Sequence, residues 1–122
     1  MDRAIFDTVV DEALAELPAV FARQLDNVTI VIEDEPAPEL LRSLGMDPRR
    51  HTLFGLYQGV PLSARGASFG NALPDTISIF YRPILRACRT PERIRHEVRR
   101  TLIHEIGHFF GMDDDEIRRL GY

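Results

Sequence analysis

TPERIRHEVRRTLIHEIGHFFG, residues 90–111, is the stretch that most clearly predicts structure in this 122-residue chain. Thr90 is a good N-cap, Pro91 suits a first helical turn, and Glu92 complements the helix dipole. No residue breaks the helical pattern before Gly111, a common C-terminal stop. An apolar row runs along the stretch: Ile94, Val98, Leu102, Ile106 and Phe109. The stretch therefore predicts one long helix that buries a face against a sheet.

Shorter elements are predicted around this helix. Apolar residues at helical spacing predict a helix over about residues 3–17, which Pro18 ends or kinks before a further helical segment. The strand candidates are VTIVIE (28–33), TLFGLYQG (52–59) and TISIFY (76–81), and a short helix is expected from Pro38 to Gly45. The residues between the last two strands are rich in Gly, Pro, Ser and Asn and predict a long loop. This order predicts a single α+β domain, residues 1–122, with three or four strands.

Composition narrows the possible partners. The formal net charge of −4 argues against a nucleic-acid partner, and no apolar run reaches the length of a membrane span. A single cysteine, Cys88, excludes an internal disulfide and suggests a cytoplasmic protein with a free thiol. All 15 basic residues are Arg, and seven lie between Arg82 and Arg100. We expect a solvated helix face with ion pairs there; a phosphate-binding stripe is the alternative.

The dipeptide His-Glu occurs twice in the predicted helix, and its first copy, His96-Glu97, lacks the geometry of a metal site. A zinc site on one helix needs two imidazoles about one turn apart. The residue one turn after His96 is Arg100, a fixed cation that would repel a metal ion. We therefore assign no metal to the first copy and a structural or supporting role to Glu97.

The second copy begins HEIGH, which has the pattern His-Glu-x-x-His. His104 and His108 are four residues apart, so both imidazoles share a face and can reach one ion. Glu105 projects beside that ion, where its carboxylate can take a proton from a zinc-bound water and pass it to a leaving amine. Gly111 permits a sharp turn that can return Asp114 toward the ion. The predicted site is Zn²⁺ held by His104, His108 and Asp114, with Glu105 as general base.

The acidic run after Gly111 has a second interpretation, which is compatible with the first. Asp113 can be the N-cap of a last helix, with Glu116 as its capping-box partner. That helix would place Asp114 in its first turn, which does not prevent metal binding. Asp113 and Asp115 are the alternative third ligands, and a water molecule alone in the third position is a further alternative.

TLIHEIGHFFGMDD resembles the motif of zincin metallopeptidases in which an aspartate replaces the third histidine of the metzincins. A closer likeness is to short bacterial proteins called minimal zincins, and it extends to DNVTIVIED, LFGLYQGVPLSARG and PDTISIFYRPIL. The resemblance implies a reduced zincin fold, in which a small mixed sheet packs against an N-terminal helix and the motif helix. It also implies zinc on His104, His108 and Asp114 and a peptidase activity.

For a peptidase we expect an extended peptide or protein substrate, added along an edge strand at residues 52–59 or 76–81. A second group that stabilises the oxyanion is also expected, and Tyr57, Tyr81 or an Arg could supply it. The simpler interpretation is that both tyrosines are packed sheet residues and that His51 is a surface residue.

Two alternatives stay open from the sequence. The chain could keep a metal-containing zincin scaffold for a peptide-binding or chaperone-like role with little turnover. Two histidines and one carboxylate suit Zn²⁺, and they also suit Fe(II), Co²⁺ or Ni²⁺.

Overall fold

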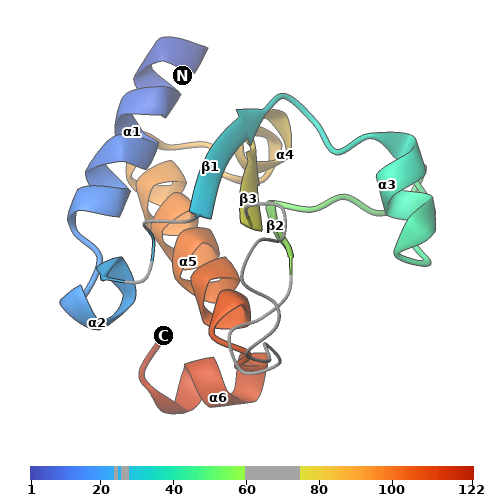
Figure 1. Ribbon diagram of the computed structural model, residues 1–122. Coiled ribbons are helices and arrows are strands. Elements are labelled where there is room, and N and C mark those ends of the chain that lie inside the picture. Colours follow the sequence, from blue (N-terminus) through green and yellow to red (C-terminus); the bar gives the residue numbers. More distant parts are fainter. Residues whose placement is uncertain (24, 26–27, 60–74) are drawn as a thin grey trace.

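The computed structural model describes residues 1–23, 25, 28–59 and 75–122, which contain both helices and strands (Figure 1). In chain order the elements are α1 (Arg3–Ala15), α2 (Ala19–Ala22), β1 (Val28–Glu33), α3 (Pro38–Ser43), β2 (Gly55–Gln58), β3 (Asp75–Phe80), α4 (Tyr81–Ala87), α5 (Pro91–Phe109) and α6 (Asp114–Arg119). The α+β class predicted from the sequence is confirmed. No helix among the described residues is both long and apolar enough to cross a membrane.

The three described strands form one mixed sheet in the order β1-β3-β2. β1 runs parallel to β3, with Val28 opposite Asp75, whereas β2 runs antiparallel to β3, with Gly55 opposite Ile79. β3 is therefore the central strand, and its near-continuous burial agrees with that place. Of the two strand candidates for an exposed edge, the structure puts β2 at an edge of the described sheet and β3 inside it.

The long helix α5 has the boundaries that its capping residues predict. The Thr90 side chain accepts a hydrogen bond from the Arg93 amide at 3.2 Å, and Pro91 opens the first turn. The predicted apolar row is buried throughout: Ile94, Val98, Leu102, Ile106 and Phe109. This row packs α5 against α1 and against β2 and β3.

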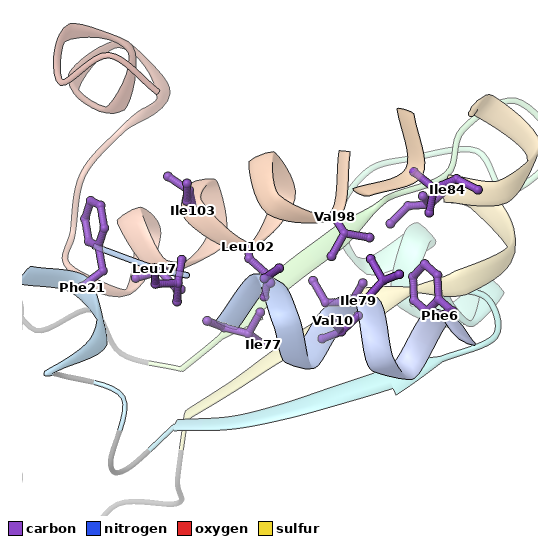
Figure 2. Close-up of a cluster of buried hydrophobic side chains, with 14 of the residues drawn as sticks. Phe6, Val10, Leu17, Phe21, Ile77, Ile79, Ile84, Val98, Leu102 and Ile103 are labelled. Atoms are coloured by element: carbon purple, nitrogen blue, oxygen red, sulfur yellow. The ribbon is translucent and has the colours of Figure 1, made fainter. Parts of the chain in front are cut away.

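The core lies where α1, α5 and the sheet meet (Figure 2). Phe6 and Val10 from α1, Ile77 and Ile79 from β3, and Leu102 from α5 are each at most 1% exposed. Burying side chains of this size contributes about 1.5–3 kcal/mol each. This packing fixes the position of α5, and with it the position of the His-Glu-x-x-His motif.

Two sequence predictions differ from the structure. The predicted strand 76–81 begins at Asp75 and ends at Phe80, and Tyr81 opens α4, a helix that the sequence did not predict. Pro83 lies in the first turn of α4, where its missing N–H is tolerated. A proline disfavours helical geometry in the residue before it. Arg82 precedes Pro83, so the sequence argued against a helix at this place. The predicted long loop lies outside the described residues, except for Asp75.

Candidate metal centre

His104, Glu105 and His108 all lie in the C-terminal half of α5. Their side chains are 14%, 12% and 36% exposed, so Glu105 and His104 are largely enclosed and His108 is more open. The helix then ends in a Schellman turn. The Gly111 amide donates to the His108 carbonyl at 2.9 Å, and the Met112 amide donates to the Gly107 carbonyl at 2.9 Å.

Gly111 occupies the left-handed position of this turn, with φ of 84°. The chain turns sharply here, and α6 packs against the end of α5. As a result, one carboxylate oxygen of Asp114, Oδ1, lies 3.1 Å from His108 Nε2 and 3.5 Å from His104 Nδ1. The expected return of Asp114 toward both histidines is thus present in the structure.

The neighbouring carboxylates have other partners. Asp113 caps α6 by accepting from the Glu116 amide at 2.8 Å, and the Glu116 side chain accepts from the Asp113 amide in return. This is the predicted capping box. Asp115 pairs with Arg118 at 2.8 Å. Asp114 is therefore the acid of this run whose carboxylate faces both histidines.

Gly107 is a residue whose importance the sequence analysis missed. A Cβ at this position would lie 2.5 Å from Ile117 Cδ1, so α6 packs directly on the bare backbone of α5. Ile117 is 1% exposed and anchors α6 there. The available signal was a glycine inside a helix, where it costs stability unless a close approach requires it.

Glu105 is held by the sheet. The Tyr57 amide in β2 donates to Glu105 Oε1 at 2.8 Å, and His108 Nδ1 lies 3.3 Å from the same oxygen. The amide of Phe80 in β3 donates to the carbonyl of Phe54, so these two residues form a hydrogen-bonded pair. Hydrogen-bonded and non-hydrogen-bonded pairs alternate along antiparallel strands. The pair of Tyr57 with Ile77 is therefore not hydrogen-bonded, and the Tyr57 amide points away from β3. An outward-facing amide of the edge strand thus orients the predicted general base.

Gly55 makes this approach possible, and it too was missed by the sequence analysis. A Cβ on Gly55 would lie 2.6 Å from Thr101 Cγ2, 3.0 Å from the Ser78 carbonyl oxygen and 3.4 Å from Glu105 Cγ. α5 therefore crosses β2 at a point where only glycine fits without displacement. The close crossing lets the Tyr57 amide reach Glu105.

The electrostatics of the site centre on His108. Its pKa is raised from 6.5 to about 9, first by the hydrogen bond with Glu105 and further by Asp114, while burial acts in the opposite direction. Both ring nitrogens face carboxylates, which suits the doubly protonated imidazolium. The pKa of Asp114 is lowered, mainly by its hydrogen bond with His108.

The donor set has the chemistry that zinc requires. Among the described residues no group of three or more His, Cys, Asp or Glu side chains is arranged to hold a metal ion as it stands, and His108 and Asp114 hydrogen-bond to each other. Their chemistry nevertheless fits, since two imidazoles and one carboxylate are a common catalytic zinc set. Asp114 Oδ1 also lies 3.1 Å from His108 Nε2 and 3.5 Å from His104 Nδ1, so the three side chains lie close together, although not in the arrangement that holds an ion.

The first His-Glu pair lies apart from these residues. His96 is exposed on α5, and the Glu97 carboxylate accepts from Thr101 Oγ1 at 3.1 Å and pairs with Arg100 at 3.4 Å. Glu97 therefore pairs with Arg100 and Thr101, which lie within the next turn of the same helix.

The tyrosines considered as oxyanion donors both have partners elsewhere. Tyr57 Oη donates to Asp75 Oδ2 at 3.1 Å, and Tyr81 Oη donates to the Met1 carbonyl. His51 Nδ1 accepts from the Asp47 amide on the surface, as expected for a surface residue. Cys88 is a free, partly buried thiol, and burial is the main reason why its pKa is raised.

Comparison with known proteins adds a family and a fold. A sequence model of the family described as zincin-like metallopeptidase matches residues 25–122. Among solved structures, a conserved hypothetical protein from Thermo thermophilus superimposes with a TM-score of 0.57 at 23% identity, over 98% of this chain and 97% of that one. At that identity the likeness shows the fold alone. A search of curated proteins gave no match.

Proposed function

Because the chain belongs to the zincin-like metallopeptidase family, we propose that it is a zinc-dependent peptidase whose ligands are His104, His108 and Asp114. The observation that carries the proposal is the position of Glu105. Its carboxylate lies between the Tyr57 amide of the sheet edge and His108, next to the contacts of Asp114 with both histidines. A zinc ion held there would act as a Lewis acid toward a peptide carbonyl and would make a water more acidic.

The chain's own residues supply the proton transfer. Glu105 accepts the proton of the attacking water and delivers it to the leaving amine. The Tyr57 amide holds one carboxylate oxygen of Glu105 in place, which limits the rotation that would misdirect the proton. The low exposure of Glu105 excludes bulk water, which strengthens these interactions.

The substrate in this proposal is an extended peptide alongside β2. β2 is an edge of the described sheet, and the backbone groups of Gly55 and Tyr57 point away from β3. Because the Tyr57 amide already donates to Glu105, an added strand would hydrogen-bond to the outward groups of Gly55 and present its scissile bond beside Glu105. The other candidate, β3, offers no such edge, because it is paired on both sides.

The experiment compares the two His-Glu pairs. Elemental analysis of protein without a His tag is expected to give about one zinc per chain, lost in His104→Ala and kept in the matched control His96→Ala. A peptide library is then incubated with wild type, Glu105→Gln and Glu97→Gln. Cleavage by wild type and Glu97→Gln, absent in Glu105→Gln, supports the peptidase.

Two outcomes would contradict it. Cleavage that survives Glu105→Gln excludes Glu105 as the general base. Peptides that are retained by the wild type but never cut favour the alternative, a metal-binding zincin scaffold with a peptide-binding or chaperone-like role. A different metal in the elemental analysis, such as iron, would reassign the cofactor and leave the residues unchanged.

A further inference from the structure

A cavity of about 710 Å³ is lined by residues that follow β1 and β3 and by residues of α3 and α4. Figure 1 shows α3 and α4 away from α6. Its wall contains four arginines, Arg49, Arg50, Arg82 and Arg86, together with His51. Its size falls within the usual range of about 300–1,000 Å³ for small-molecule sites. None of its lining residues belongs to the candidate metal centre.

A backbone hydrogen bond links the ends of the two parallel strands at one side of the cavity. The Arg82 amide donates to the Asp34 carbonyl at 3.0 Å and so joins the residues that follow β1 and β3. Ligands in open α/β sheets commonly bind outside the carboxyl ends of parallel strands, where the chain departs to different helices. β1 and β3 provide such an end.

The opposite wall is a compact turn between α3 and β2. Asp47 organises it: its carboxylate accepts from the Arg49 amide at 2.9 Å, and its carbonyl accepts from the amides of Arg50 and His51 at 3.0 and 2.9 Å. The Asp47 amide donates to His51 Nδ1 at 3.2 Å. Three consecutive cationic or donor side chains thus project from a backbone that is already ordered, which reduces the entropy lost on binding.

The charges in the cavity do not cancel. Its two carboxylates, Asp34 and Glu35, are each engaged: Asp34 pairs with Arg3 at 3.0 Å, outside the cavity, and Glu35 with Arg86 at 2.5 Å. Among the residues that the structure describes, neither Arg49 nor Arg82 has a carboxylate partner. Arg50 reaches Asp47 only at 3.9 Å and is 82% exposed. A positive excess therefore collects here on a chain of net charge −4.

Part of the wall is apolar. Leu41 is 3% exposed, and the other apolar residues of the lining are Ala37 and three prolines, Pro36, Pro38 and Pro48. A ligand that fits this wall has an uncharged body as well as an anionic group. Guanidinium groups match the oxygens of phosphate and carboxylate with paired hydrogen bonds.

From these observations we propose that the cavity between α3 and α4 binds a small dianion whose charges lie on oxygen atoms, either a phosphate monoester or a dicarboxylate. Arg49 and Arg82 are the primary contacts, and His51 adds a hydrogen-bond donor through the nitrogen that does not accept from Asp47. The site is separate from the metal centre, and the proposal does not depend on the peptidase activity.

The test is a titration of isotope-labelled full-length protein with three probes: inorganic phosphate, glucose 6-phosphate and succinate, at low ionic strength where screening is weak. Saturable shifts of the Thr52 and Leu41 amides with phosphate and glucose 6-phosphate identify a phosphate site. The same shifts with succinate instead identify a dicarboxylate site. Either result supports the proposal.

The variants separate the cavity from general attraction of anions. The double variant Arg49→Gln with Arg82→Gln is expected to weaken binding by at least about tenfold, because two charge-assisted contacts are lost. Arg119→Gln, an exposed arginine of α6, is the matched control and is expected to bind within about twofold of wild type. The three substituted arginines are all exposed on the surface. Thermal unfolding will verify that each variant is folded.

Three results would overturn the proposal. The first is that no probe gives saturable binding. The second is that the control weakens binding as much as the double variant, which means that net charge alone attracts the anion. The third is that the shifts centre on His108 and Asp114 and leave Thr52 and Leu41 unchanged, which means that the oxyanion binds at the metal centre.

Discussion

The backbone amide of Tyr57 donates to Glu105 Oε1 at 2.8 Å, although 48 residues separate the two in the chain. This bond ties the edge strand β2 to the helix that carries the His-Glu-x-x-His motif. It also connects the fold to the proposed chemistry, because the group that orients the general base belongs to the strand expected to receive the substrate. The contact depends on how closely β2 and α5 approach, and the first prediction addresses that approach.

Gly55→Ala should destabilise the protein by roughly 1–3 kcal/mol, as overpacked sites commonly do. The added Cβ would lie 2.6 Å from Thr101 Cγ2 and 3.0 Å from the Ser78 carbonyl oxygen, so β2 or α5 must move. Urea unfolding measures the loss. Adding Thr101→Ser, which removes the nearer methyl, should recover part of it; an undiminished loss would show that the Thr101 contact is not the cause.

Gly107→Ala should weaken zinc binding more than it weakens folding. Alanine is the better helix former by about 1 kcal/mol, which offsets part of the clash. The Cβ would lie 2.5 Å from Ile117 Cδ1, so α6 must shift and move Asp114 away from the histidines. Competition with a chromophoric chelator measures the affinity. Adding Ile117→Val, which removes that Cδ1 but keeps Cγ1 at 2.7 Å, should recover part of it, and an affinity unaffected by Gly107→Ala would contradict this role of α6.

Zinc should stabilise the folded chain through the motif. If only the folded state binds, free zinc at 100-fold its Kd adds about 2.7 kcal/mol to the free energy of unfolding. Thermal unfolding with zinc and with a chelator will show the difference as a change in Tm. His104→Ala should abolish that change, and His96→Ala should keep it. An equal response in both variants would mean that zinc binds elsewhere.

The zinc-free protein should lose stability at alkaline pH through His108. Its pKa is raised from 6.5 to about 9, chiefly by the hydrogen bond with Glu105, so the folded state binds this proton more tightly than the unfolded state does. The stabilisation is complete below pH 6.5 and is lost as the pH rises through about 9. The Tm measured in the presence of a chelator should be lower at pH 9.5 than at pH 6.

Because His108 is partly exposed, solvent screening keeps this effect modest. His108→Gln is the control and should reduce the fall in Tm. A proton titration of the His108 ring by NMR gives the pKa directly, and a value near 6.5 would contradict the ion pairs described for the zinc-free site.

Local interactions explain which features could be predicted from the sequence. The limits of α5 follow from Thr90, Pro91 and the turn at Gly111, and the capping box of α6 follows from Asp113 and Glu116. Each of these features depends on residues within about one helical turn of one another, so the pattern of residue types is sufficient. The shared face of His104 and His108 follows from the helical repeat in the same way.

Helix α4 shows the limit of that reasoning. The run TISIFY predicts a strand through Tyr81, and the proline that follows argues against a helix. In the structure the chain turns after Phe80, where the buried residues Pro83 and Ile84 add to the packing of α4. Tertiary burial overrode the local preference.

The sequence by itself therefore determined the motif helix, its caps, and the turn that allows Asp114 to return. Only the tertiary structure decided the strand order β1-β3-β2, the close crossings at Gly55 and Gly107, and the bond from Tyr57 to Glu105. The physical reason is the range of the interactions. Caps and helical spacing act over a few residues, whereas strand order and close packing depend on contacts between segments far apart in the chain, and these are settled by how the whole core is buried.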